Sequence, residues 1–106
     1  MAKFLFEARY NSAGAKGIAQ EGGSGRRAAI AKLAKSVGGK LEAFYFALGE
    51  VDAYVIVDIP DQVSAAAVAL AVNQSGVVSV RTVALISTDD MDKAAKKTVN
   101  YRPPGK

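Results

Sequence analysis

Few side chains of this sequence could carry out chemistry, because it contains no histidine and no cysteine. Their absence excludes disulfides, thiolate metal sites and a cysteine nucleophile. It also removes the commonest general base and transition-metal ligand. Any acid–base step must therefore use Asp, Glu, Tyr or Lys. No serine stands in a nucleophile elbow and no carboxylates have metal-ligand spacing, so we expect neither a metal nor a cofactor.

Several charged and aromatic side chains alternate along segments that we predict to be strands. They predict a polar pocket on one face of a sheet, because buried charges need a partner or a ligand. The candidate pocket residues are Glu7, Arg9, Glu42, Phe44, Phe46, Asp52, Tyr54, Asp58 and Arg81. A simpler interpretation stays open, in which Arg9 and Arg81 pair with Glu7 and Asp58 across neighbouring strands.

A second candidate site is a glycine-rich stretch followed by two arginines. Backbone N–H groups at a helix start, with guanidinium groups behind them, can bind an anion. The candidate anion-binding residues are Gly23, Ser24, Arg26 and Arg27. The spacing matches neither a dinucleotide fingerprint nor a P-loop. The alternative is a flexible loop with solvated arginines.

The segment Gly49–Asp52 is typical of a tight turn. Glycine supplies a positive φ there, and the Asp52 carboxylate can bond the backbone of its own turn. The functional alternative makes Asp52 a base or a ligand group at the mouth of a pocket.

The elements that must position these groups follow from the hydrophobic periodicity. Period two predicts strands, and a stripe such as Ile30, Leu33, Ala34 and Val37 predicts a helix. The expected strands are Lys3–Tyr10, Lys40–Leu48, Ala53–Ile59 and Val77–Ser87, and the expected helices are Arg26–Val37 and Gln62–Gln74. We expect a loop over Asn11–Gly25, a short third helix starting at residues 88–92, and an extended tail over residues 99–106.

This order of elements predicts one α+β domain over residues 1–106 with the ferredoxin-like βαββαβ fold. Both main helices should cover one face of a four-stranded antiparallel sheet. If Phe4, Phe6 and Tyr10 meet the helices, bulky apolar residues remain on the open face, namely Leu5, Phe44, Phe46, Ile56, Val83 and Leu85. Since a monomer rarely exposes such a patch, we expect a homodimer or a higher homo-oligomer with sheets packed face to face.

The net charge of +4 invites a nucleic-acid interpretation, but no nucleic-acid motif accompanies it. Basic residues alternate with alanine on a helix, which is typical of a solvated surface. No apolar run approaches the roughly 20 residues of a membrane helix, and the first residues do not resemble a signal peptide. We therefore expect a cytoplasmic protein that binds neither nucleic acid nor membrane.

Two segments, Val37–Phe46 and Gly49–Asp61, resemble parts of one known family. The first is similar to the helix end and second strand of the GYD domain family. The second is similar to the naming segment of that family, Gly-x-Tyr-Asp followed by an apolar strand and Pro-Asp. The likeness spans nearly the whole chain and includes Glu21–Arg27 and Ala94–Gly105. Val51 stands where the naming motif has tyrosine. The resemblance implies a ferredoxin-like domain related to dimeric α/β barrels, and it implies no particular reaction.

Three functions remain open from the sequence. The first is a homodimer that binds a small molecule or has a regulatory role. The second is a cofactor-independent enzyme, monooxygenase-like or isomerase-like, with its pocket on the open sheet face. The third is a structural or interaction module whose tail docks on a partner. Fold analogy alone does not choose among them.

Overall fold

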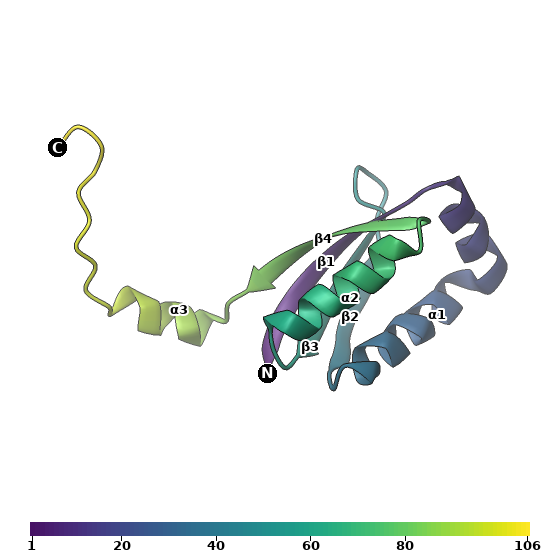
Figure 1. Cartoon of the computed structure of the whole chain (residues 1–106), viewed down its shortest axis with the longest axis horizontal. Helices are drawn as coiled ribbons and strands as arrows, with labels where there is room; N and C mark the ends of the chain where they lie inside the picture. Colours follow the sequence, from purple (N-terminus) through teal and green to yellow (C-terminus); the bar gives the residue numbers. More distant parts are fainter.

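Four strands form one antiparallel sheet in the order β2-β3-β1-β4 in the computed structural model, which describes all 106 residues (Figure 1). The elements are β1 (Ala2–Tyr10), α1 (Ser12–Ser36), β2 (Lys40–Phe46), β3 (Ala53–Ile59), α2 (Gln62–Gln74), β4 (Val78–Leu85) and α3 (Thr88–Ala95). The predicted α+β ferredoxin-like arrangement, with a further C-terminal helix, is confirmed.

The sheet separates its side chains by the period of two that the sequence predicts. Phe4 and Phe6 of β1 point toward the helices, where they are buried. Between them, Leu5 lies opposite Ile56 of β3 and Val83 of β4, on the open face. The main core cluster consists of Phe4, Phe6, Ala34, Val55, Val57, Ile59, Ala65 and Val68.

A β-bulge in β2 reverses part of this pattern, so the prediction that Phe44 and Phe46 lie on the open face is wrong. The pairing register with β3 shifts between Leu41 and Ala43. The shift moves Phe44 and Phe46 to the other face of the sheet from the one that strict alternation predicts. Phe44 then lies opposite Val55 and packs against the core on the helix side. A bulge adds one residue to one strand, and nothing in the local composition marks where it falls.

The loop expected over Asn11–Gly25 is also wrong, because α1 begins at Ser12 and its helical residues include most of this stretch. The Asn11 side chain caps it by accepting a 3.0 Å hydrogen bond from the backbone N–H of Gly14. A Cβ on Gly14 would collide with the Val77 carbonyl, so this glycine permits close packing beside β4. Gly14 lowers the helix propensity of this stretch, but its missing Cβ is what allows this packing.

The helix α1 is broken at Gly22, whose φ of 77° and ψ of 167° are not helical. Only glycine adopts such angles readily. A second helical segment follows the break and runs to Ser36.

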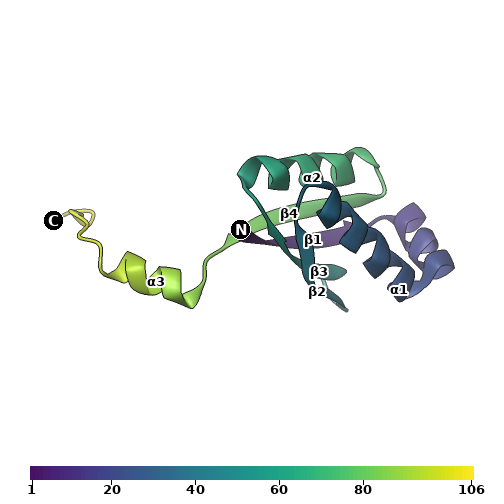
Figure 2. The same ribbon diagram turned by 90° about the horizontal axis from the view of Figure 1, so that it is seen from below.

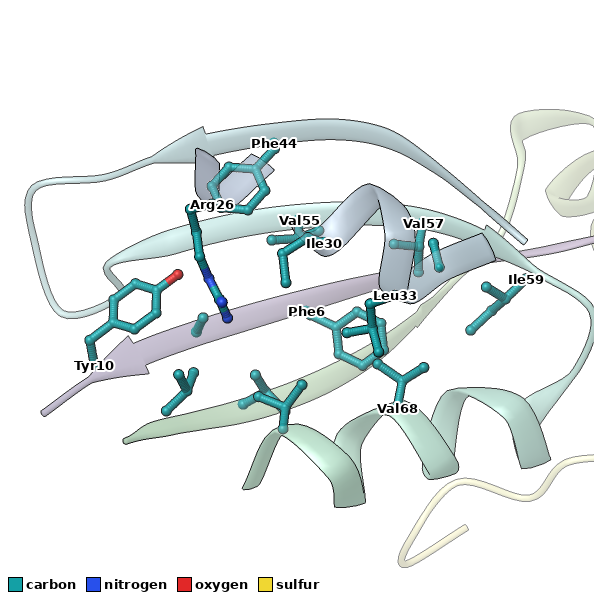
Figure 3. A pocket seen from close by; sticks show the side chains of 15 residues that line it. Phe6, Tyr10, Arg26, Ile30, Leu33, Phe44, Val55, Val57, Ile59 and Val68 are labelled. Carbon is teal, nitrogen blue, oxygen red and sulfur yellow. The ribbon is translucent and has the colours of Figure 1, made fainter. Parts of the chain in front are cut away.

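Each helix lies mainly over one edge of the sheet, α1 against β2 and α2 against β4. The central strands β1 and β3 are therefore covered mostly by side chains that reach inward from both helices. Ile30 and Leu33 come from α1, and Val68 comes from α2 (Figure 3). Val72 of α2 also lines this space. This arrangement decides where space remains inside the domain.

The C-terminal arm, residues 86–106, projects away from the sheet and both main helices (Figures 1 and 2). Every residue from Arg81 to Lys106 is exposed, and α3 buries none of its side chains. The radius of gyration is 16.8 Å, whereas a compact chain of this length has about 13 Å. None of the helices combines the length and apolar character required to cross a membrane.

Candidate functional site

A small apolar cavity lies between the two main helices and the sheet, with a volume of about 40 Å³ (Figure 3). Of the 15 residues that line it, 14 are hydrophobic. Phe6, Val55 and Val80 form its floor on the sheet, and Ile30 and Leu33 contribute from α1. The cavity exists because the helices sit over the sheet edges and leave the centre to side chains alone.

Arg26 is the one charged residue that lines this cavity. It lies at one end beside Tyr10, and Ile59 lies at the other end (Figure 3). The guanidinium carbon of Arg26 is 6.0 Å from the centroid of the Tyr10 ring, at the limit of a cation–π contact. The Nε atom of Arg26 is buried and has no hydrogen-bond partner, and no carboxylate forms an ion pair with this side chain.

The break at Gly22 explains how Arg26 reaches this position. It starts a new helical segment, and Arg26 stands in the first turn of that segment. Beside the break, a Cβ on Gly23 would lie 3.2 Å from the Phe46 ring, so this glycine lets α1 approach β2 closely. The kink and this close approach together position the first turn over the end of the cavity.

An open cleft of about 170 Å³ lies next to the cavity, beneath the first half of α1. The cleft and the cavity share three lining residues, Tyr10, Arg26 and Val78. Gly17 and Glu21 of α1 also line the cleft. Arg26 therefore borders both an apolar interior space and a wider, solvent-connected one.

Asp52 is positioned to hold Tyr10 in place. Its carboxylate accepts a 2.8 Å hydrogen bond from the backbone N–H of Tyr10, and its own N–H donates to the Ala8 carbonyl at 2.9 Å. The predicted turn is present, but the carboxylate bonds the end of β1 and not its own turn. Gly49 does not have the positive φ that we expected of it. Val51, at the position of the motif tyrosine, is buried.

The open face brings three of the candidate pocket residues into one row. Glu7 of β1 lies opposite Tyr54 of β3 on one side and opposite Arg81 of β4 on the other. Tyr45 extends the row onto β2, where it lies opposite Tyr54. A carboxylate, a guanidinium and two phenols thus share one level of the sheet.

The ion pairs of the open face differ from the predicted ones. The Lys3 ammonium contacts Glu42 Oε1 at 2.8 Å and Asp58 Oδ2 at 3.5 Å. The hydrogen bond to Glu42 is the main reason why the pKa of Lys3 is raised above its ordinary value. Arg9 donates instead to the Glu50 carbonyl at 2.7 Å. Lys3 was missed because strand register, which alternation leaves undefined, selects cross-strand partners.

The four candidate anion-binding residues separate in the structure. Arg26 reaches the cavity, and Gly23 lies against Phe46. Ser24 and Arg27 are exposed and line neither the cavity nor the cleft.

Sequence reasoning missed Tyr10, Ile30 and Leu33 as lining residues of a site. The helical stripe that contains Ile30 and Leu33 carries the signal, but a stripe predicts a packed core equally well. Only the spacing between the two helices distinguishes a packed core from a cavity. No group of three or more Asp or Glu side chains is arranged to hold a metal ion.

Comparison with known proteins identifies one family. The family model described as the GYD domain matches residues 4–95 of the chain. No curated protein and no solved structure matches. Because the match covers most of its length, the chain belongs to the GYD domain family.

Proposed function

We propose that this member of the GYD domain family is a homodimer that binds a small molecule between its helices and its sheet. One observation carries the proposal: an apolar cavity meets a wider cleft at Arg26 and Tyr10. Apolar walls with a few convergent polar groups are the usual form of a small-molecule site. The proposed site therefore lies on the helix-covered face of the sheet, whereas the sequence predicts a pocket on the open face.

The cavity volume limits what can enter. An engineered cavity of about 150 Å³ holds one benzene molecule, and this cavity has about 40 Å³. Its occupant is therefore a short alkyl group, and the rest of the ligand occupies the cleft. A larger ring would require Ile30 and Leu33 to move outward with the second segment of α1.

The first test is native mass spectrometry of the freshly purified chain, with and without Leu33→Trp. The larger side chain fills the cavity, so we expect a co-purifying small molecule to be lost. Leu70→Trp is the matched control, because Leu70 is exposed on α2 and lines neither space. Equal ligand retention by both variants would contradict the proposed site.

The open face of the sheet is the feature that supports a homodimer. Leu5, Ile56 and Val83 lie side by side across three strands there, and no element of the chain covers them. Tyr45 is 72% exposed on the same face. A second copy with the same face would remove this apolar surface from water through a two-fold symmetric contact.

The C-terminal arm supports the same assembly. An isolated helix of fewer than about 12 residues is marginal in water, and α3 has 8 residues with no packing partner in its own chain. Met91, Val99 and Tyr101 of the arm are exposed. A second copy would provide a surface for them.

Sedimentation analysis tests the assembly. Val83→Lys should convert dimers to monomers, whereas Leu70→Lys on the outer side of α2 should not. Removal of residues 86–106 should weaken the dimer without unfolding the domain. A monomeric wild-type chain at micromolar concentration would overturn this part of the proposal.

A cofactor-independent enzyme is the second candidate, favoured by the row of Glu7, Tyr54 and Arg81. A carboxylate beside a phenol and a guanidinium can move a proton and stabilise an anion without histidine. Turnover of quinones or small carbonyl compounds, lost in Glu7→Gln, would favour it. Ligand binding without any turnover would favour the binding protein.

A further inference from the structure

We infer that the ligand of the cavity and cleft is a short-chain monocarboxylate, with its carboxylate at Arg26 and its alkyl chain in the cavity. This inference rests on the proposed small-molecule function and adds the chemical class of the ligand.

An arginine side chain carries a positive charge on a planar guanidinium with several N–H donors. The Nε–H of Arg26 is buried beside apolar side chains and donates to no acceptor. A buried donor without an acceptor is costly, and the cost is larger when the group is charged. Once the Arg26 side chain turns its buried Nε–H toward the adjacent cleft, a carboxylate there would accept this N–H and a second one from the same planar fork, in the bidentate geometry that arginine and carboxylates form.

The charge around the site favours one negative charge on the ligand. Arg26 is the one cation that lines the cavity or the cleft, and Glu21 of α1 lines the cleft as well. A phosphate group carries more charge and is usually bound by several donors together. A cleft lined by one guanidinium and one carboxylate of the protein is a poor site for a dianion and an adequate one for a monocarboxylate.

The walls of the cavity determine the polarity of the ligand at the end opposite its carboxylate. Its lining carries no polar side chain beyond the Arg26–Tyr10 end. A second charged or hydroxyl-bearing end would be buried without a partner there. The chain that extends from the carboxylate is therefore apolar, and with about 40 Å³ available it is short.

Butyrate and butyramide are the probes, because they share an alkyl chain and differ in charge. Both are titrated at millimolar concentration into the full-length, ¹⁵N-labelled protein, and backbone amide shifts are followed around Ile30, Leu33 and Val68. We expect butyrate to bind at least about 10-fold more tightly than butyramide, as the strength of a charge-assisted hydrogen bond suggests.

Four variants examine the roles of the charges. Arg26→Gln should weaken butyrate binding by about 10-fold or more and leave butyramide unaffected. Arg26→Lys should recover part of the loss. Glu21→Gln should tighten butyrate binding, since it removes a carboxylate from the cleft. Lys32→Gln is the matched control, because it removes one positive charge from an exposed position of the same helix and should change nothing.

The outcomes separate this inference from the proposed function. Equal binding of butyrate and butyramide would overturn the carboxylate assignment and leave the small-molecule site standing. If neither probe binds but a different molecule co-purifies in the cavity, the assignment also fails alone. If neither binds and nothing co-purifies, both the assignment and the proposed function fail. The comparison of butyrate with butyramide on the wild-type protein tests the carboxylate assignment even if the Arg26 variants do not fold.

Discussion

The carboxylate of Asp52 accepts a 2.8 Å hydrogen bond from the backbone N–H of Tyr10, the residue whose ring lies beside Arg26. The motif aspartate is thus connected through one strand end to the cavity. Its effect on a ligand would be indirect, because Asp52 lines neither the cavity nor the cleft.

Asp52→Ala should lower the free energy of unfolding by about 1 to 2 kcal/mol, since it leaves the Tyr10 N–H without a charged acceptor. Asp52→Asn retains an oxygen acceptor, so it should lower the free energy of unfolding by less than Asp52→Ala does. Urea denaturation measures both changes. Asp89→Ala, an exposed change on α3, is the control and should have little effect. An unaltered stability of Asp52→Ala would show that the bond does not hold the end of β1.

Two glycines of α1 should respond to alanine in opposite directions. Nothing lies within 4 Å of a Cβ added at either Gly17 or Gly22, so neither change is blocked by space. Gly22 has a φ of 77°, so Gly22→Ala should lower the free energy of unfolding by about 1 to 3 kcal/mol. Gly17 is inside the helix, so Gly17→Ala should raise the free energy of unfolding by about 1 kcal/mol. Thermal unfolding measures the pair, and a stabilising Gly22→Ala would mean that the break is not required.

Phe44 and Tyr45 are neighbours on β2, and the bulge determines which of them faces the core. Their substitution by alanine should therefore affect stability to different extents. Phe44 packs against the core, so Phe44→Ala should lower the free energy of unfolding by about 2 to 4 kcal/mol. Tyr45 lies on the open face, and Tyr45→Ala should change it by no more than about 0.5 kcal/mol in the monomer.

The Phe44 and Tyr45 comparison is made at a concentration where sedimentation shows monomers. The effect of Tyr45→Ala should then grow as the concentration is raised and the open faces meet. The reverse ranking, with Tyr45 the more sensitive residue in the monomer, would mean that β2 lacks the bulge.

Asp61 should make the stability depend on pH in acid. Its side chain caps α2, and the hydrogen bond from the Ser64 N–H lowers the pKa of this carboxyl below its ordinary value of 3.8. A lowered folded pKa means that the stabilisation is present above 3.8 and is lost as the pH falls through the folded value.

Asp61→Asn is the matched variant, because asparagine can cap the helix but does not titrate. The difference in melting temperature between wild type and Asp61→Asn should shrink as the pH falls below 3.8. A difference that is the same at neutral and acid pH would contradict the role of the ionised cap.

Much of the fold follows from local patterns. The strand that contains Phe4 and Phe6 alternates clearly, so its helix-facing side is predicted correctly, and the helix Gln62–Gln74 has the predicted bounds. Residues 12–21 were predicted as a loop because glycine is a poor helix former. Their helix includes Gly14, where a Cβ would collide with the carbonyl of Val77, a residue far along the chain.

The candidate sites were predicted less well than the fold. Arg26 was identified as a possible anion ligand from its position after a glycine-rich stretch, but its partners in the cavity come from β1, β4 and both helices. On the open face, Lys3 pairs with Glu42 and Asp58 in place of the predicted arginines. Both outcomes depend on distances between elements, which periodicity does not contain.

The sequence by itself determined the order of elements, the helix-facing side of β1 and the chemical groups that any site could use. It did so because hydrophobic periodicity, capping residues and composition are local properties of the chain. Only the tertiary structure decided that a bulge turns Phe44 inward, that Gly22 breaks α1, and that Arg26 and Tyr10 meet at a cavity. These features arise from register and from the separation of the helices, which are set by packing between residues distant in sequence.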